Sequence, residues 1–300
     1  MRTVALHSAM VARSMKAASL NSFAFSTGGI IGTLGGLIGL GGAEFRLPVL
    51  IGLFHFRALD AIIVNKAVSL IVVAVALPFR ASVVPFAQIS DHWGVIANLL
   101  AGSLLGAWFG AGVALRLASP ALYRVIALLL ALIAVVLLFG HGGGTGQPLF
   151  EGVLQQVAGV AAGFAIGIFA SVLGVAGGEL LIPTLILLFG CDVKLAGSLS
   201  LAVSLPTMLV GFARYSQDKS FAVLARNRGF LIAMGLGSVA GAFAGSLLLG
   251  IVRAEVLLPL LALLLAGSAV KIWLHARRAA PGPRFPPPPS RSTLPTDPTG

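Results

Sequence analysis

Charged residues are scarce in this 300-residue chain, since Asp, Glu, Lys and Arg together make up 10% of it. Soluble domains carry about a quarter of such residues. Hydrophobic residues make up 58%, and the mean hydropathy is +1.02. This composition excludes a soluble enzyme and a disordered chain. The single cysteine, Cys191, excludes an internal disulfide framework.

Acidic residues are the scarcer of the two charged kinds. Nine Asp and Glu stand against twenty Lys and Arg, which gives a formal net charge of +11. The basic residues lie between long apolar stretches and form no dense cluster ahead of the C-terminal tail. That distribution argues against a nucleic-acid partner and is typical of membrane topology signals. We therefore expect a multi-pass protein embedded in a lipid bilayer.

Eight apolar stretches approach the length of a membrane-spanning helix, which is about 20 residues. None alternates apolar and polar residues as the strands of a membrane β-barrel do, so the predicted fold class is an all-α polytopic membrane protein. Four stretches carry no charge: 22–43, 93–115, 152–178 and 229–252. Four are shorter or carry one charge: 61–79, 121–140, 195–213 and 256–270.

An internal repeat relates the two halves of the chain. GLIGLGGAEFRLPVLIGLF (36–54) matches SVLGVAGGELLIPTLILLF (171–189) at an offset of 135 residues. Further glycines align at this offset, namely Gly28 and Gly32 with Gly163 and Gly167, Gly94 with Gly229, and Gly102, Gly106 and Gly110 with Gly237, Gly241 and Gly245. The predicted organisation is a cytosolic leader (1–21), a first repeat (22–140), a linker (141–152), a second repeat (153–276) and a disordered, Pro-rich cytosolic tail (277–300).

The segment 25–56 is too long for one span and too short for two, because 32 helical residues reach about 48 Å against a core of roughly 30 Å. A single crossing would give parallel repeats of four spans. A break at the glycines and a return would give a hairpin plus three spans in inverted repeats. The hairpin puts seven loop Lys and Arg inside and three outside, whereas the single crossing divides them five and five. The positive-inside rule therefore favours inverted repeats with both termini cytoplasmic.

Each half carries a glycine pair followed by a glutamate and a proline. The copies are Gly41-Gly42-Ala43-Glu44-Phe45-Arg46-Leu47-Pro48 and Gly177-Gly178-Glu179-Leu180-Leu181-Ile182-Pro183. Glycine lets the chain leave helical geometry, and proline is favoured at the first position of a helix. Each copy therefore predicts a helix end, a turn and a new helix whose first amides suit an anion. We expect both copies to meet in one anion site, with Gly41, Gly42, Ala43, Gly177 and Gly178 as backbone contacts.

The charged residues of these elements have several possible roles. Glu44 and Glu179 align, and each could cap the amides of its own helix, relay protons or coordinate a cation. Arg46 could neutralise Glu44 or contact the substrate, while the second copy has Leu181 at that position. Lys66 could extend to the membrane interface or bind the substrate.

Small polar residues recur in the spans that follow. Asn65 and Ser69 lie on one helical face, and the offset brings Ser200 and Ser204 to the matching positions. They could bond neighbouring backbone carbonyls or bind oxyanion oxygens of the substrate. Glycines spaced four apart without polar companions, as at 102–110 and 237–245, are interpreted as helix-packing surfaces. The histidines lack metal-binding spacing, and no hydrolase motif occurs. We therefore expect the protein to bind no metal or cofactor and not to be an enzyme.

The elements GLGGAEFRLPVL and GVAGGELLIPTLILLFG, in a duplicated chain of this length, resemble the TauE/SafE family of sulfite exporters. The resemblance covers roughly residues 25–275, and Ala43 and Ala176 stand where a third glycine is frequent. Its glycine-rich stretches fall on Gly39, Gly41 and Gly42 and on Gly174, Gly177 and Gly178. It implies transport of sulfite, sulfoacetate or other organosulfonates, usually outward across a bacterial cytoplasmic membrane.

Three functions are compatible with these features. The first is an anion exporter working by alternating access, since a monoanion leaving a cell at 100 mV, negative inside, gains about 2.3 kcal/mol. The second is an importer of a related anion coupled to protons or sodium. The third is a channel-like or assembly component in which the hairpins serve packing alone. The sequence leaves a homo-oligomer open.

Overall fold

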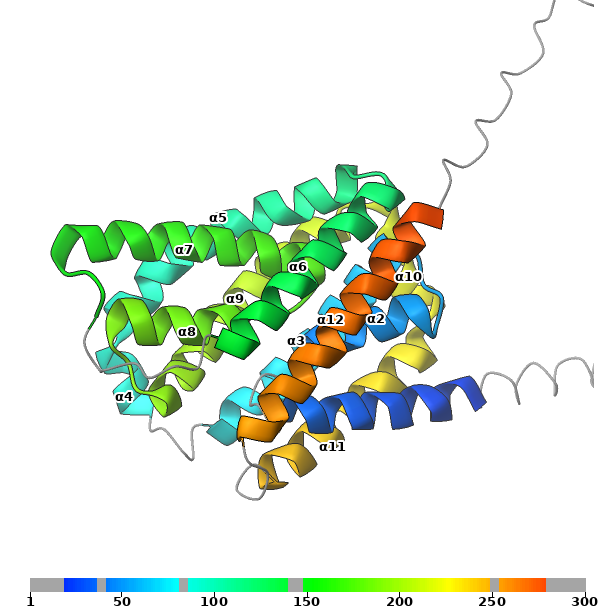
Figure 1. The fold of residues 1–300 in the computed structure, drawn as a ribbon, viewed down its shortest axis with the longest axis horizontal. Coiled ribbons are helices and arrows are strands. Elements are labelled where there is room, and N and C mark those ends of the chain that lie inside the picture. The colour runs from blue at the N-terminus through cyan, green and yellow to red at the C-terminus, as the bar shows by residue number, and fades with distance from the viewer. Residues whose placement is uncertain (1–18, 37–41, 81–85, 140–147, 249–253, 279–300) are drawn as a thin grey trace, which may run out of the picture.

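The computed structural model describes residues 19–36, 42–80, 86–139, 148–248 and 254–278. Every regular element in these ranges is helical (Figure 1), as the all-α fold class predicts. A helix over residues 19–36 comes first. It is followed by α2 (Ala43–Gly52), α3 (Ala58–Arg80), α4 (Phe86–Asp91), α5 (Trp93–Arg116), α6 (Ser119–Phe139), α7 (Gly152–Leu173), α8 (Gly178–Phe189), α9 (Val193–Ser216), η1 (Lys219–Phe221), α10 (Ala222–Arg226), α11 (Arg228–Leu248) and α12 (Ala254–Arg278). The predicted leader, linker and tail lie largely outside the described residues.

The helix boundaries repeat along the chain. Helices α8, α9, α11 and α12 begin 135 residues after α2, α3, α5 and α6, respectively. The helix over 19–36 corresponds to α7, and the short α4 corresponds to η1 with α10. The duplication predicted from glycine spacing therefore extends to the whole set of helices.

Each Gly-Gly element forms a hairpin with the helix before it. In the second repeat the Leu149 amide donates to the Leu187 carbonyl at 2.9 Å, so the start of α7 meets the end of α8. In the first repeat the rings of Phe23 and Phe54 lie 5.5 Å apart, so the start of the first helix meets the end of α2. With 10 and 12 residues, α2 and α8 extend only about 15 and 18 Å. Each is a half-length helix that turns back, as the hairpin arrangement predicts.

The predicted span 152–178 is wrong at its C-terminal end. Helix α7 ends at Leu173 because Gly174 takes a left-handed conformation, with φ 67°, and closes the helix. The apolar run continues past Gly174 to Gly178, so its length overstates the length of the helix.

The two repeats exchange their first helices. The helix over 19–36 packs along α11 of the second repeat, and α7 packs along α5 of the first. A Cβ on Gly28 would collide with the Met234 carbonyl, and one on Gly163 would collide with the Leu99 carbonyl. Gly163 is the counterpart of Gly28 at the 135-residue offset, and Leu99 is the counterpart of Met234, so the two contacts are equivalent. Such paired contacts are typical of two repeats related by a two-fold axis. The glycines expected to pack do meet backbone of the other repeat, as at Gly102, Gly106, Gly110, Gly237 and Gly241.

Five described helices are long and apolar enough to cross a bilayer: Ala58–Ala76, Trp93–Arg116, Gly152–Leu173, Leu195–Ser216 and Arg228–Gly245. Three shorter apolar helices accompany them: Ser119–Val135, Gly178–Phe189 and Leu265–Leu274. Large apolar side chains such as Leu105, Phe109 and Leu128 are exposed on the outside of the bundle. A bundle apolar both inside and outside is a polytopic membrane protein.

The close helix contacts predict a position-specific effect of adding a methyl group on α5. Gly102→Ala places a Cβ against the Val160 carbonyl, whereas Gly94→Ala, on the same helix, meets nothing within 4 Å. Overpacking of this kind lowers the free energy of unfolding by about 1–3 kcal/mol. Thermal unfolding in detergent should show a lower midpoint for Gly102→Ala and a midpoint near wild type for Gly94→Ala. Equal midpoints would contradict the proposed packing.

Candidate functional site

Each hairpin breaks at a glycine with a left-handed backbone. Gly42 precedes α2 with φ 71°, and Gly177 precedes α8 with φ 83°. A side chain is strained in this region, and glycine is not. The helices begin at Ala43 and Gly178, and neither N-cap residue supplies a side-chain bond to the first amides. Gly41, the remaining predicted backbone contact, lies outside the described residues.

The prediction that each proline occupies the first position of its helix was wrong. Pro48 and Pro183 are the sixth residues of α2 and α8 rather than the first, because the left-handed glycines alone turn the chain and the helix starts directly after them. Proline has no N–H, so in each helix it removes the bond to the carbonyl four residues earlier. Those carbonyls belong to Glu44 and Glu179. The backbone ladder is therefore interrupted on both sides of each glutamate.

Asn65 on α3 ties the two breaks together. Its Nδ2 donates to the carbonyl of Ala43 at 3.0 Å and to that of Leu173, the last residue of α7, at 3.1 Å. Ser69, one turn further along α3, donates to the Asn65 carbonyl at 2.7 Å and lies 3.5 Å from the Gly174 carbonyl. One face of α3 thus holds the start of α2 against the end of α7. The predicted convergence of the two elements is present in the structure.

Arg46 extends this network from α2. Its Nη1 donates to Asn65 Oδ1 at 3.2 Å and to Ser69 Oγ at 3.1 Å, and its side chain is fully buried. Glu44 and Arg46 also attract each other electrostatically. A guanidinium is therefore fixed beside the first break, on the residues that bridge to the second.

Glu44 and Glu179 are buried together at the centre of the convergence. Their side chains are 0% and 3% exposed, and their carboxyl groups are close enough to interact electrostatically. Neither carboxyl makes a hydrogen bond of standard geometry among the described residues, while the Glu44 carboxyl lies close to its own backbone amide and to the Glu179 carboxyl. No set of three His, Cys, Asp or Glu side chains in the described ranges could hold a metal ion.

Lys66 lies inside the bundle rather than reaching the interface. It is 0% exposed, and its Nζ donates to the Ala170 carbonyl on α7 at 3.3 Å. A Cβ on Gly211 would lie 2.9 Å from Lys66 Nζ and 2.6 Å from Ser171 Oγ, so these two groups share one small space. The Ser171 hydroxyl has no partner among the described residues, while its carbonyl accepts from the Tyr215 hydroxyl at 2.9 Å.

Ser171 and Tyr215 were missed by the sequence analysis. Tyr215 is one of only two tyrosines in the chain, and a buried hydroxyl in an apolar helix needs a partner. That scarcity was the available signal. Ser171 gave none, because its counterpart in the first repeat is Gly36.

The second repeat supplies less polarity than the first. Ser200 donates to the Gly197 carbonyl of its own helix at 2.9 Å, as its backbone-bonding interpretation predicts. Ser204 is buried, and its hydroxyl has no partner among the described residues, since Leu181 stands where the first repeat has Arg46. The backbone frame of the site is two-fold, but both of its cations come from the first repeat.

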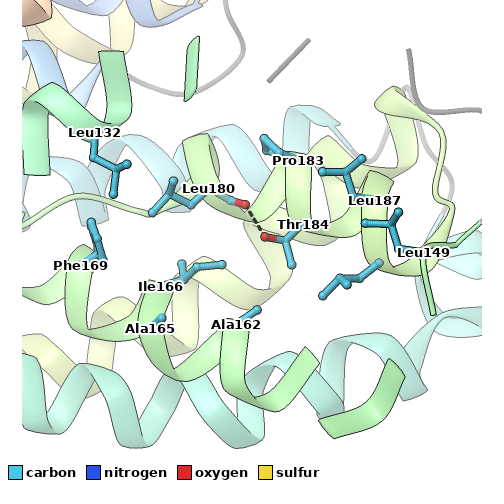
Figure 2. A pocket seen from close by; sticks show the side chains of 11 residues that line it. Leu132, Leu149, Ala162, Ala165, Ile166, Phe169, Leu180, Pro183, Thr184 and Leu187 are labelled. Atoms are coloured by element: carbon cyan, nitrogen blue, oxygen red, sulfur yellow. Dashed lines mark hydrogen bonds between the residues drawn. The ribbon is translucent and has the colours of Figure 1, made fainter. Parts of the chain in front are cut away.

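Two cavities of the described bundle lie away from this convergence. One, of about 380 Å³, lies between α6, α7 and α8 (Figure 2). Its only polar side chain, Thr184, donates to the Leu180 carbonyl at 2.7 Å, so it offers nothing to an anion. The other, of about 470 Å³, opens at one end of the bundle. Neither is lined by Glu44 or Asn65, and the convergence is buried in this conformation.

Residues 4–137 and 158–296 match the family described as sulfite exporter TauE/SafE. The chain belongs to this family. Both Gly-Gly elements and most of the described helices lie within the two matched segments. Neither the curated proteins nor the solved structures gave a match.

The bridging bonds predict that Asn65 stabilises this TauE/SafE fold more than its counterpart Ser200 does. Asn65→Ala strips the partner from two buried carbonyls and from Arg46, which lowers the free energy of unfolding by about 1–3 kcal/mol. Ser200→Ala removes one bond within its own helix and should cost less than about 1 kcal/mol. Thermal unfolding of both variants in detergent tests this difference, and an equal loss would mean that Asn65 does not hold the breaks together.

Proposed function

We propose that the protein transports a small sulfur-containing anion, such as sulfite, sulfoacetate or another organosulfonate, by alternating access. The TauE/SafE match supports transport of a sulfur anion. The observation that carries the proposal is the Asn65 bridge, because it joins two breaks whose helix starts lack side-chain caps. In this proposal the first amides and the positive ends of both helices bind the anion together in the dry interior, where such groups bind anions most strongly.

The surrounding side chains fit an oxyanion. Arg46 and Lys66 supply buried positive charge near the breaks. Ser171 and Ser204 supply buried hydroxyls whose oxygens have no partner among the described residues. A sulfite or sulfonate group has three oxygens that accept such donors. Binding there replaces the water that the anion loses on entering the membrane.

The arrangement of the hairpins supports alternating access. The first hairpin opens at the end of the bundle that holds α10, and the second opens at the end that holds α4. Three long helices follow each hairpin, namely α3, α5 and α6 in the first repeat and α9, α11 and α12 in the second. An odd number of crossings reverses the orientation of the next repeat. We therefore infer inverted repeats, which allow a buried central site to open to either side by similar movements.

Charge supports an outward direction. Described loop cations gather at the end that holds α10, including Arg57, Arg116, Arg226 and Arg228. The positive-inside rule makes that end cytoplasmic, with both chain termini on that side of a bacterial cytoplasmic membrane. A monoanion leaving through such a membrane gains about 2.3 kcal/mol per 100 mV. Export then needs no coupling ion and no catalytic step.

The left-handed glycines provide the sharpest test of the binding site. Gly177→Ala forces a side chain into a strained backbone, so sulfite or sulfonate flux into proteoliposomes should fall at least about tenfold as the amides are displaced. Gly178→Ala is the matched control, because the first repeat already has Ala43 at this position, and it should keep near-normal flux.

Two results would contradict the proposal. Normal flux in Gly177→Ala protein would remove the break from the mechanism. Flux of the wild-type protein that rises linearly with substrate, without saturation, would favour a channel-like component instead.

Proton-coupled uptake of a related anion is the second candidate, and the paired carboxyls favour it. With Arg46, Lys66, Glu44 and Glu179 all ionised, the buried site has no formal net charge. One proton taken up by the glutamate pair makes the site positive and so admits an anion together with that proton. Poor pairing of buried acids is what a proton-carrying site requires.

The candidates differ in how flux depends on pH. If protons are coupled, wild-type flux rises as pH falls, because protonation of the pair adds positive charge to the site. Replacing both acids, as Glu44→Gln with Glu179→Gln, should then abolish the rise in flux at low pH. The measurement uses a sulfonate, because its charge, unlike that of sulfite, stays constant between about pH 5 and 8. Unchanged pH dependence in this double variant excludes the proton-coupled importer.

A further inference from the structure

The second cavity, of about 470 Å³, opens at the end of the bundle where the first hairpin opens. Both repeats line it. Arg57 lies in the turn between α2 and α3, and Asp60 lies in the first turn of α3. Arg226 and Asn227 come from the junction of α10 and α11. Its volume falls in the range of small-molecule sites, roughly 300–1,000 Å³. It is therefore large enough for a small organic anion.

The polar lining of this cavity is predominantly basic. Arg57 and Arg226 are exposed to solvent there, and His55 lies between the first hairpin and Arg57. Asp60 is the single acidic residue among the residues that line it. Its apolar wall is a cluster of rings, in which Phe54 and Phe230 lie 4.8 Å apart. Positive groups over an apolar floor suit an organic anion such as a sulfonate.

The internal repeat reverses the charge of this feature at the opposite end of the bundle. At the 135-residue offset, Arg57 corresponds to Asp192 and Arg226 corresponds to Asp91. Asp91 is the last residue of α4, and Asp192 directly precedes α9. The Asp192 carboxylate accepts a hydrogen bond from the Leu195 amide at 3.1 Å. In Figure 1, α4 lies at the end of the bundle away from α10. The duplicated frame thus carries arginines beside the cavity at one end of the bundle and aspartates at the equivalent positions of the other end.

We infer that the cavity at Arg57 and Arg226 is a capture site for the anionic cargo, and that Asp91 and Asp192 oppose its capture from the opposite side. This inference rests on the proposed transport function and adds a direction-setting element to it. A basic mouth raises the local concentration of an anion and its rate of association, and an acidic mouth lowers them. The central site can then bind the anion equally well from both sides of the membrane, while the anion reaches it faster from the basic side.

The test compares transport from the two faces. Right-side-out and inverted membrane vesicles containing the full chain present opposite mouths to labelled sulfite or sulfoacetate. In the double variant Arg57→Gln with Arg226→Gln, the half-saturating concentration should rise about threefold to tenfold from the basic mouth at low ionic strength. It should stay near wild type from the other mouth, which also shows that the variant is folded. The difference should shrink in about 0.5–1 M salt, which screens surface charge.

Two further variants serve as controls. Arg228→Gln removes the same charge at the same end without lining the cavity, so it should leave the half-saturating concentration near wild type. Asp91→Asn with Asp192→Asn should lower that concentration from the opposite mouth alone. Asparagine at 192 keeps an acceptor for the Leu195 amide.

The outcomes separate the capture site from the transport function. An equal change from both faces, no change, or a change matched by Arg228→Gln would overturn the capture role while transport stands. A change that occurs only in proteoliposomes containing anionic lipid, and not in purely zwitterionic ones, would assign the cavity to a lipid headgroup and overturn it as well. Absence of saturable flux in the unmodified protein would overturn the transport proposal itself, and the capture role with it.

Discussion

The constraint on which this structure depends is that a helix broken inside a membrane must find protein partners for its exposed backbone. No water is available in the hydrocarbon core, and each unsatisfied polar group there costs several kcal/mol. The glycines at 42 and 177 create two such breaks. Asn65 meets part of that demand with one amide that bonds to carbonyls from both. The interaction that stabilises the breaks is also the one that brings them together.

A symmetric frame with asymmetric chemistry follows from the duplication. The helices, the left-handed glycines, the interior prolines and the two glutamates recur in both halves, whereas Arg46 and Lys66 are replaced by leucines, Leu181 and Leu201. In the proposed transporter, symmetry gives two openings of similar energy, and asymmetry fixes the charge of the cargo. The opposite charges at the two mouths extend the same division to the ends of the bundle.

Much of this fold could be predicted because its signals are local and repeated. Glycine spacing and the 135-residue offset predicted the duplication and the packing surfaces, since close backbone contact tolerates almost no other residue. The length of segment 25–56 and the distribution of loop cations predicted the hairpins. The start of α2 and α8 was misplaced because a left-handed glycine and a proline at the first helical position both begin helices, and the sequence does not rank them. Lys66 was left undecided because its burial depends on α7 and α9, which are far away in the chain. Ser171 was missed because its counterpart in the first repeat is Gly36, so the repeat did not single it out.

The most direct test of the central claim is to locate a bound anion. Selenite, the selenium analogue of sulfite, can be placed by anomalous scattering in crystals of the full chain. We predict a selenium peak within hydrogen-bonding reach of the first amides of α2 and α8, beside Arg46. Saturable sulfite transport together with a selenium peak only outside the convergence of the two breaks would contradict the account.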